Sequence, residues 1–129
     1  MWKLATAFLL VAMPAFGELI RSDIVYMIDG DTASIGEARD RVRLVGFDTP
    51  ETRNAQCSYE KALGDEATRR ARELVKNAGA VDLVMLPGRD KYDRGLGRLY
   101  VGGKELGTIL ISEGLARPYD GGKRRSWCK

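Results

Sequence analysis

The architecture of this chain can be worked out from IVYMIDGDTASIGEARDRVRLVGFDTPE, residues 24–51. Three runs within it have the β-branched or alternating pattern of strands, at 24–28, 32–35 and 41–47. Asp29-Gly30 supplies the first turn, and Pro50 ends the third run. Because side chains alternate across a strand, Arg41 and Arg43 are expected on the same face. These residues predict three short strands in succession.

The rest of the chain adds two helices and two strands. Predicted helices cover 58–77 and 106–113, and predicted strands cover 81–86 and 96–101. Ser58 is expected to cap the first helix, and Pro87-Gly88 to end the fourth strand. The first helix carries an apolar stripe made of Ala62, Leu63, Ala67, Ala71, Leu74 and Val75. We therefore expect an α+β fold, a small five-stranded OB-type β-barrel with two helices, one inserted after strand 3.

Length and composition are those of one globular domain. The chain has 129 residues, 44% hydrophobic and 30% charged, which is enough for a single core. Its formal net charge of +3 is compatible with a polyanionic partner but does not require one. We expect the domain to cover 18–119 and a basic tail to cover 120–129.

Residues 1–17 have the pattern of a secretory signal peptide. Lys3 supplies a positive charge, an apolar run follows, and Ala15 and Gly17 form a small-x-small cleavage motif. The apolar run is too short to span a bilayer comfortably. We expect cleavage near Gly17 and a secreted or periplasmic protein, with an uncleaved anchor as the alternative.

The chain has two cysteines, Cys57 and Cys128, and no histidine. An exported chain with two cysteines most simply forms one disulfide bond, and two unpaired thiols are the alternative. The bond would close a loop of about 70 residues and stabilise the fold by up to about 4 kcal/mol. A zinc site is not expected, because histidine and a second cysteine pair are both missing.

Acidic residues follow two of the predicted strands. Asp29 and Asp31 flank Gly30, a pattern that by itself is typical of a turn without a metal. Asp48 ends the next strand, and two aspartates with the Thr49 carbonyl would form an oxygen-only site that suits Ca²⁺. Glu51 is then a candidate general base toward a nearby water, or else a solvated loop glutamate.

Arg43 and Arg94 are the candidate phosphate ligands, because guanidinium groups donate in pairs to phosphate oxygens and stay protonated. Each has a simpler interpretation, Arg43 as part of an exposed strand face and Arg94 as a turn residue. Lys91 and Tyr92 are candidates to contact a terminal phosphate, and Tyr119 to stack on a base. All three are equally compatible with an exposed loop.

In their order these motifs resemble the staphylococcal-type nuclease (thermonuclease) family. The matching blocks lie between about Ile24 and Tyr119: D-G-D-T, R-x-R-L, D-T-P-E, A-L-G-D-E-A, D-K-Y-D-R and G-L-A-R-P-Y. The resemblance implies a secreted, Ca²⁺-dependent OB-barrel enzyme that cleaves single- or double-stranded DNA or RNA to 3′-phosphate and 5′-hydroxyl products. A monomer without a protein partner is expected.

The resemblance also implies roles for single residues. Asp31, Asp48 and the Thr49 carbonyl would bind Ca²⁺, with Asp29 behind them. The catalytic positions would be Arg43, Glu51 and Arg94.

Two departures from the family pattern stand out. Asp93 replaces a glycine, and we expect its carboxylate partly to neutralise Arg94. The chain also ends soon after Tyr119, where the type member continues into a longer helical segment. We expect a Cys57–Cys128 bond to anchor the tail instead, beside the loop after Glu51, with 123–125 near the nucleic-acid groove. A binding module without catalysis and a structural scaffold are the alternatives to an enzyme.

Overall fold

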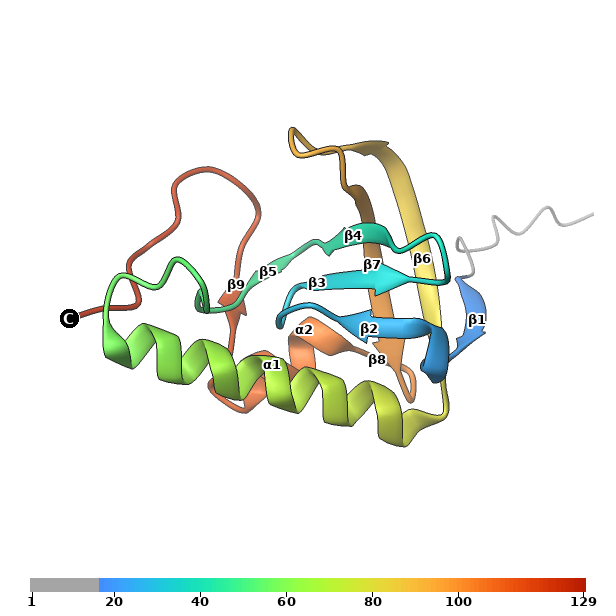
Figure 1. Cartoon of the computed structure of the whole chain (residues 1–129), viewed down its shortest axis with the longest axis horizontal. Helices are drawn as coiled ribbons and strands as arrows, with labels where there is room; N and C mark the ends of the chain where they lie inside the picture. Colours follow the sequence, from blue (N-terminus) through green and yellow to red (C-terminus); the bar gives the residue numbers. More distant parts are fainter. Residues whose placement is uncertain (1–16) are drawn as a thin grey trace, which may run out of the picture.

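A computed structural model describes residues 17–129 and contains a curled sheet, a separate two-stranded ladder and two helices along one side (Figure 1). The strands are β1 (Glu18–Arg21), β2 (Val25–Met27), β3 (Thr32–Ile35), β4 (Asp40–Leu44), β5 (Phe47–Asp48), β6 (Ala80–Arg89), β7 (Gly95–Val101), β8 (Lys104–Glu105) and β9 (Arg117–Pro118). The helices are α1 (Ser58–Ala78), α2 (Leu106–Ser112) and the 3₁₀ turn η1 (Ser22–Ile24). The predicted α+β fold of OB type is confirmed. The predicted signal peptide lies outside the described residues, except for Gly17.

The strands of the curled sheet lie in the order β1-β6-β7-β4-β3-β2, and β8 pairs with β7. β2, β3 and β4 form an antiparallel meander, and β4 pairs in parallel with β7, which joins the meander to the long β6–β7 hairpin. In the β3–β4 register Thr32 lies opposite Arg43. β5 pairs with β9 in a separate two-stranded ladder, which brings Asp48 beside Arg117.

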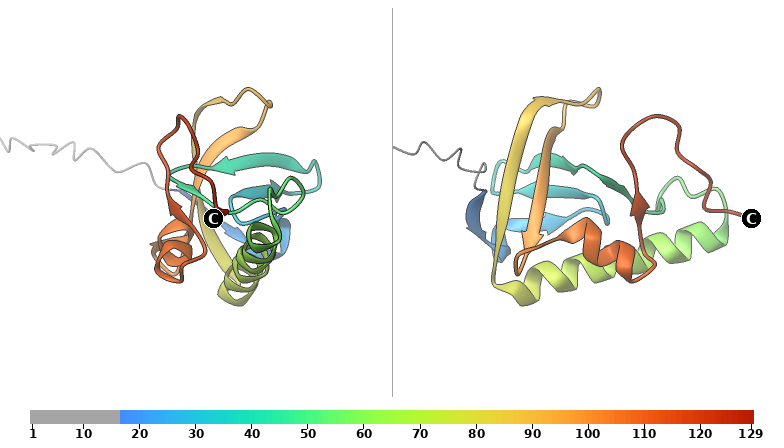
Figure 2. Two further views of the ribbon diagram at one scale, coloured as in Figure 1. Left: turned by 90° about the vertical axis from the view of Figure 1, so that its left-hand side faces the viewer. Right: turned by 180° about the vertical axis from the view of Figure 1, so that it is seen from behind.

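The core lies between the curled sheet and the helices (Figure 2). α1 contributes Ala67, Ala71 and Val75, which are fully buried at helical spacing, and α2 contributes Leu106 and Leu110. Leu63 and Leu74 pack against this core, whereas Ala62 is exposed. The predicted stripe is therefore correct except at its first residue. No helix within residues 17–129 has both the length and the apolar character needed to cross a membrane.

Several element boundaries differ from the sequence prediction. The expected strand 41–47 ends at Leu44, because Gly46 has a positive φ of 93° that turns the chain before β5. β6 runs through Pro87-Gly88 to Arg89, and a register shift absorbs the proline. The chain between Gly17 and η1 forms a further strand, β1, which pairs with β6. Cys57, rather than Ser58, caps α1, because its Sγ accepts a hydrogen bond from the Glu60 amide.

α1 approaches the loop after β5 closely at Gly64. A Cβ atom added to Gly64 would lie 2.6 Å from the Glu51 carbonyl oxygen and 2.7 Å from that of Pro50. Both contacts are with backbone, which cannot rotate away as a side chain does. Gly64 therefore determines how near the loop lies to the helix.

We expect Gly64→Ala to destabilise the fold by about 1–3 kcal/mol through overpacking, although alanine normally stabilises a helix relative to glycine. Urea unfolding measures the change. Asn77→Ala, at an exposed position of the same helix, is the matched control and is expected to be neutral or slightly stabilising. An equally stable or more stable Gly64→Ala protein would show that the loop yields to the added methyl group.

Candidate active site

Asp31 and Asp48 lie together at one edge of the sheet. Asp31 precedes β3, and its Oδ2 accepts a hydrogen bond from the Thr49 amide at 3.2 Å. Asp48 ends β5 and is 1% exposed. Burial is the main cause that raises the pKa of Asp48, and the charge of Asp31 raises it further. The predicted convergence of these two aspartates is therefore present in the fold.

Negative charge is concentrated around this pair, in a group of residues called here the acidic edge: Asp29, Asp31, Asp48, Thr49 and Glu51. Asp29 turns back to accept the Asp31 amide at 3.1 Å. Burial, followed by the charges of Asp31 and Glu51, raises the pKa of Asp29 to about 7. The guanidinium group of Arg124 partly offsets the effect of burial on the pKa of Asp48, which stays raised. A positive charge at this edge would therefore be strongly stabilised.

Arg43 is held against the same edge by backbone oxygens. Its guanidinium group donates to the Leu44 carbonyl at 2.6 Å and to the Phe47 carbonyl at 3.1 Å. The Nη1 atom also lies 3.3 Å from Asp31 Oδ2. Arg43 is therefore a half-buried, fixed donor, and not part of an exposed strand face.

Arg94 reaches the site from the end of the β6–β7 hairpin. It forms an ion pair of 2.7 Å with Asp90 and donates to the Thr32 hydroxyl at 3.4 Å. That hydroxyl in turn donates to Asp31 Oδ1 at 3.2 Å. Arg94 is thus connected to the acidic edge through a single side chain, Thr32.

Asp93 does not neutralise Arg94, contrary to the sequence prediction. Its carboxylate accepts from Arg89 at 2.7 Å, so it points to the other strand of the hairpin. Asp93 has a φ of 59°, a conformation that suits glycine and is tolerated by aspartate. The exchange of glycine for aspartate thus adds a hairpin ion pair and leaves Arg94 paired with Asp90.

A cleft of about 1060 Å³ joins these elements. The predicted site residues in its wall are Arg43, Lys91, Tyr92, Arg94 and Tyr119. Lys91 and Tyr92 are exposed on the hairpin. Tyr119 is half-buried and its hydroxyl donates to the Gly122 carbonyl at 2.6 Å. The cleft is therefore lined by cations and aromatic rings from both the hairpin and the tail.

Glu51 lies beyond the cleft wall, on the acidic side. Its amide donates to Glu60 Oε2 at 3.1 Å, which fixes the backbone. Its own Oε1 accepts from Arg124 at 2.6 Å, and Arg124 is itself part of the cleft wall. The five residues Arg43, Glu51, Arg94, Asp31 and Asp48 therefore surround one region, with Arg124 among them.

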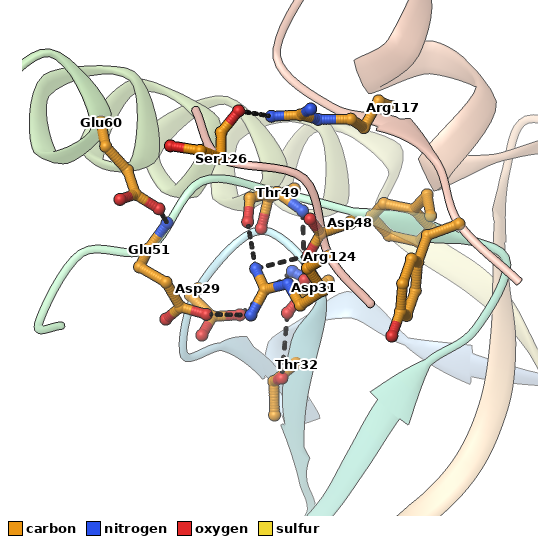
Figure 3. Close-up of polar contacts among 12 residues, drawn as sticks. Asp29, Asp31, Thr32, Asp48, Thr49, Glu51, Glu60, Arg117, Arg124 and Ser126 are labelled. Atoms are coloured by element: carbon orange, nitrogen blue, oxygen red, sulfur yellow. Dashed lines mark hydrogen bonds and ion pairs between the residues drawn. The ribbon is translucent and has the colours of Figure 1, made fainter. Parts of the chain in front are cut away.

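Arg124 is the residue that sequence reasoning did not single out. Its Nη2 lies 2.6 Å from Asp48 Oδ1 and 3.2 Å from the Thr49 carbonyl oxygen, and Nη1 binds Glu51 (Figure 3). Burial disfavours its charge, but its contacts with the accepting carboxylates of Glu51 and Asp48 raise the pKa of Arg124 above its usual value. The sequence predicts that the segment 123–125 lies near the groove. It does not predict which of these three basic residues contacts the site, because nothing in the sequence distinguishes them.

The residues present fit a hard divalent cation. Within residues 17–129, no three acidic or cysteine side chains are spaced as a metal centre. The predicted set needs only two aspartates and a carbonyl, all oxygen donors of the kind that Ca²⁺ prefers. Asp48 Oδ1 is also buried without a well-aligned hydrogen bond, although Arg124 is in ion-pair contact. This carboxylate oxygen could bind a cation when Arg124 is not in contact with it.

The loop between β5 and α1 is held at both ends by Glu60 and by a disulfide bond. Glu60 is 5% exposed, and its two carboxylate oxygens accept the amides of Glu51 and Gln56. The predicted Cys57–Cys128 disulfide is present and ties the tail to the start of α1. Glu60 lies in the first turn of α1, and its contact with the Glu51 amide sets the position of Glu51.

We expect Glu60→Ala to destabilise the protein by about 1–3 kcal/mol, because two partly buried amides lose a charged acceptor. Urea unfolding measures the loss, and hydrogen exchange at the Glu51 and Gln56 amides is expected to accelerate. Glu66→Ala is the matched control on the same helix, where an exposed ion pair with Arg69 contributes little. Unchanged protection of both amides in Glu60→Ala would contradict the assigned contacts.

The fold and site together define an OB-type barrel with an acidic edge beside an arginine-lined cleft. A family model described as staphylococcal nuclease homologue matches residues 41–126, and the chain belongs to this family. Over 104 residues it is 39% identical to endonuclease YncB of Bacillus subtilis (strain 168), an alignment covering 78% of this chain and 48% of that protein. It is 33% identical over 93 residues to thermonuclease of Staphylococcus intermedius, covering 70% and 55%.

A longer alignment relates the chain to micrococcal nuclease of Shigella flexneri. The two are 30% identical over 126 residues, which cover 89% of this chain and 67% of that protein. The chain spans about half the length of endonuclease YncB.

Proposed function

We propose that this chain is a nuclease that hydrolyses phosphodiester bonds of DNA or RNA with bound Ca²⁺. The observation that carries the proposal is the meeting of two surfaces. The acidic edge adjoins the cleft that contains Arg43 and Arg94, because Arg124 in the cleft wall contacts Asp48, Thr49 and Glu51. A phosphate between them would contact both a cation site and two guanidinium groups. The kinship with proteins named endonuclease, thermonuclease and micrococcal nuclease supports the same function.

Asp31, Asp48 and the Thr49 carbonyl would hold the ion. Bound Ca²⁺ would supply positive charge that offsets the charge of the phosphate. Asp29 lies behind this set and orients it, because its carboxylate accepts the Asp31 amide. The Thr49 amide on Asp31 Oδ2 keeps the two aspartates in a fixed relation.

Arg43 and Arg94 would bind the phosphate oxygens and stabilise the charge that develops during attack. Both are already positioned before substrate arrives, Arg43 by the Leu44 and Phe47 carbonyls and Arg94 by Asp90. Donors that need not reorganise during the reaction stabilise a transition state most effectively. Lys91, Tyr92 and Tyr119, in the same cleft wall, would contact neighbouring parts of the nucleic acid.

Glu51 would act as the general base. Its carboxylate takes a proton from the attacking water as the water oxygen bonds to phosphorus. The bond from phosphorus to the 5′-oxygen breaks, and that oxygen leaves and is protonated by solvent. The products carry 3′-phosphate and 5′-hydroxyl ends. No histidine is needed in this scheme, and the chain has none.

We expect the purified protein to cleave DNA or RNA when Ca²⁺ is present and to stop when EDTA is added. Glu51→Gln and Arg94→Ala are expected to lower the cleavage rate about 100-fold or more, because each removes a group acting on the transition state. Gel analysis of single-stranded and double-stranded substrates measures the rate. The 5′ ends are expected to accept phosphate from polynucleotide kinase without prior phosphatase treatment.

Arg89→Ala is the matched control for Arg94→Ala, because Arg89 lies in the same hairpin and pairs with Asp93. Near-normal cleavage is expected in this variant. Full activity in Glu51→Gln or Arg94→Ala would refute the assigned roles. Retardation of nucleic acid without cleavage would favour the alternative, a catalytically inactive binding module.

We also propose that the protein is exported and that its signal segment is removed after Gly17. Cleavage there would leave β1 intact, because β1 begins at Glu18. The Cys57–Cys128 bond suits an oxidising compartment. N-terminal sequencing of protein recovered from the periplasm or medium is expected to begin at Glu18. A product that retains residues 1–17 would instead indicate an anchored form.

A further inference from the structure

Arg124 makes contacts that its neighbours in the tail do not make. Its guanidinium group meets three oxygens of the acidic edge, on Asp48, Thr49 and Glu51. Lys123 and Arg125 are exposed and form no ion pair with any residue from 17 to 129. The site therefore selects one of three consecutive cations, and this contact is not a general attraction of a basic tail.

The oxygens that Arg124 contacts overlap with those that a divalent cation would need. Asp48 Oδ1 and the Thr49 carbonyl belong to both sets. A calcium ion lies about 2.3–2.6 Å from its oxygen ligands. The Arg124 nitrogen is already 2.6 Å from Asp48 Oδ1, so the two positive groups would overlap and repel each other. Occupancy by one therefore opposes occupancy by the other.

The segment that carries Arg124 is fastened at both ends. On one side the Tyr119 amide donates to the Gly46 carbonyl, and the Tyr119 hydroxyl donates to the Gly122 carbonyl. On the other side Cys128 is bonded to Cys57, and Arg117 stacks on the Trp127 ring at 3.5 Å. Between these points residues 120–126 are exposed and arch away from the sheet (Figure 1). Tethering at both ends keeps the local concentration of Arg124 high.

We propose that Arg124 is a tethered counter-cation that competes with the divalent cation for Asp48 and Thr49. Cation binding then requires the guanidinium group to leave, and the disulfide determines how strongly it competes. The inference rests on the proposed calcium site. It assigns to the tail a role in setting the calcium concentration at which the site fills.

Calorimetric titration of metal-stripped protein with CaCl₂ tests this directly, without an activity measurement. Arg124→Ala is expected to bind Ca²⁺ about 10- to 100-fold more tightly than the unmodified protein, as removal of a competing charged hydrogen-bond partner predicts. Arg125→Ala is the matched control, because it removes the same charge from the adjacent exposed position. An increase in Ca²⁺ affinity that comes only from the lower net charge is expected equally in Arg124→Ala and Arg125→Ala.

The tether is tested by Cys57→Ser/Cys128→Ser, in which serine keeps an oxygen at the cap of α1. This variant is expected to bind Ca²⁺ more tightly than the unmodified protein although Arg124 is present. In this disulfide-free variant, Arg124→Ala is expected to increase the Ca²⁺ affinity by a smaller factor than it does in the disulfide-bonded protein. Circular dichroism verifies that the variant is folded. The Arg124→Ala comparison stands whether or not the bond can be removed.

The outcomes separate this inference from the function on which it rests. Equal Ca²⁺ affinity in the unmodified protein, Arg124→Ala and Arg125→Ala would overturn the competition and leave the calcium site in place. Weaker binding in Arg124→Ala would also overturn it, since Arg124 would then support the ion. If no variant binds Ca²⁺, the calcium site and the competition fail together.

Discussion

Burial of negative charge at one edge of the barrel is the constraint on which the rest of the site depends. Asp48 and Asp31 lie where little water reaches them, and an uncompensated charge in such a place is costly. Arg43 from β4 and Arg124 from the tail supply compensating charge from distant parts of the chain. An edge built in this way is suited to exchange one cation for another, because its stability depends on a positive charge being present.

The loop from Thr49 to Cys57 transmits this constraint to the rest of the fold. Gly64 lets α1 approach its backbone, and Glu60 holds two of its amides. The disulfide then fastens the tail to the same loop. Glu51 is therefore placed by a helix, and its partner Arg124 by a covalent bond. The acidic edge and the tail are therefore both attached to the loop that precedes α1.

Most of the architecture followed from local patterns. The three early strands, α1 and the β6–β7 pair were predicted within a few residues, because alternation and helical periodicity reflect burial directly. Errors fell where local signals compete with pairing. β6 passes through Pro87-Gly88 because β7 continues beside it, and β1 forms because an edge of β6 is available. Asp93 was expected beside Arg94, but side-chain direction in a hairpin turn depends on backbone angles that composition does not specify.

The sequence alone determined which residue types were available for chemistry. These are aspartates that follow strands, the candidate phosphate ligands Arg43 and Arg94, a pair of cysteines and no histidine. These are properties of composition and order, and they can be read without coordinates. Only the tertiary structure decided that Arg124, and neither of its basic neighbours, contacts Asp48 and Glu51. That choice depends on the path of a tail closed by a bond between residues 71 positions apart, and no local pattern encodes such a path.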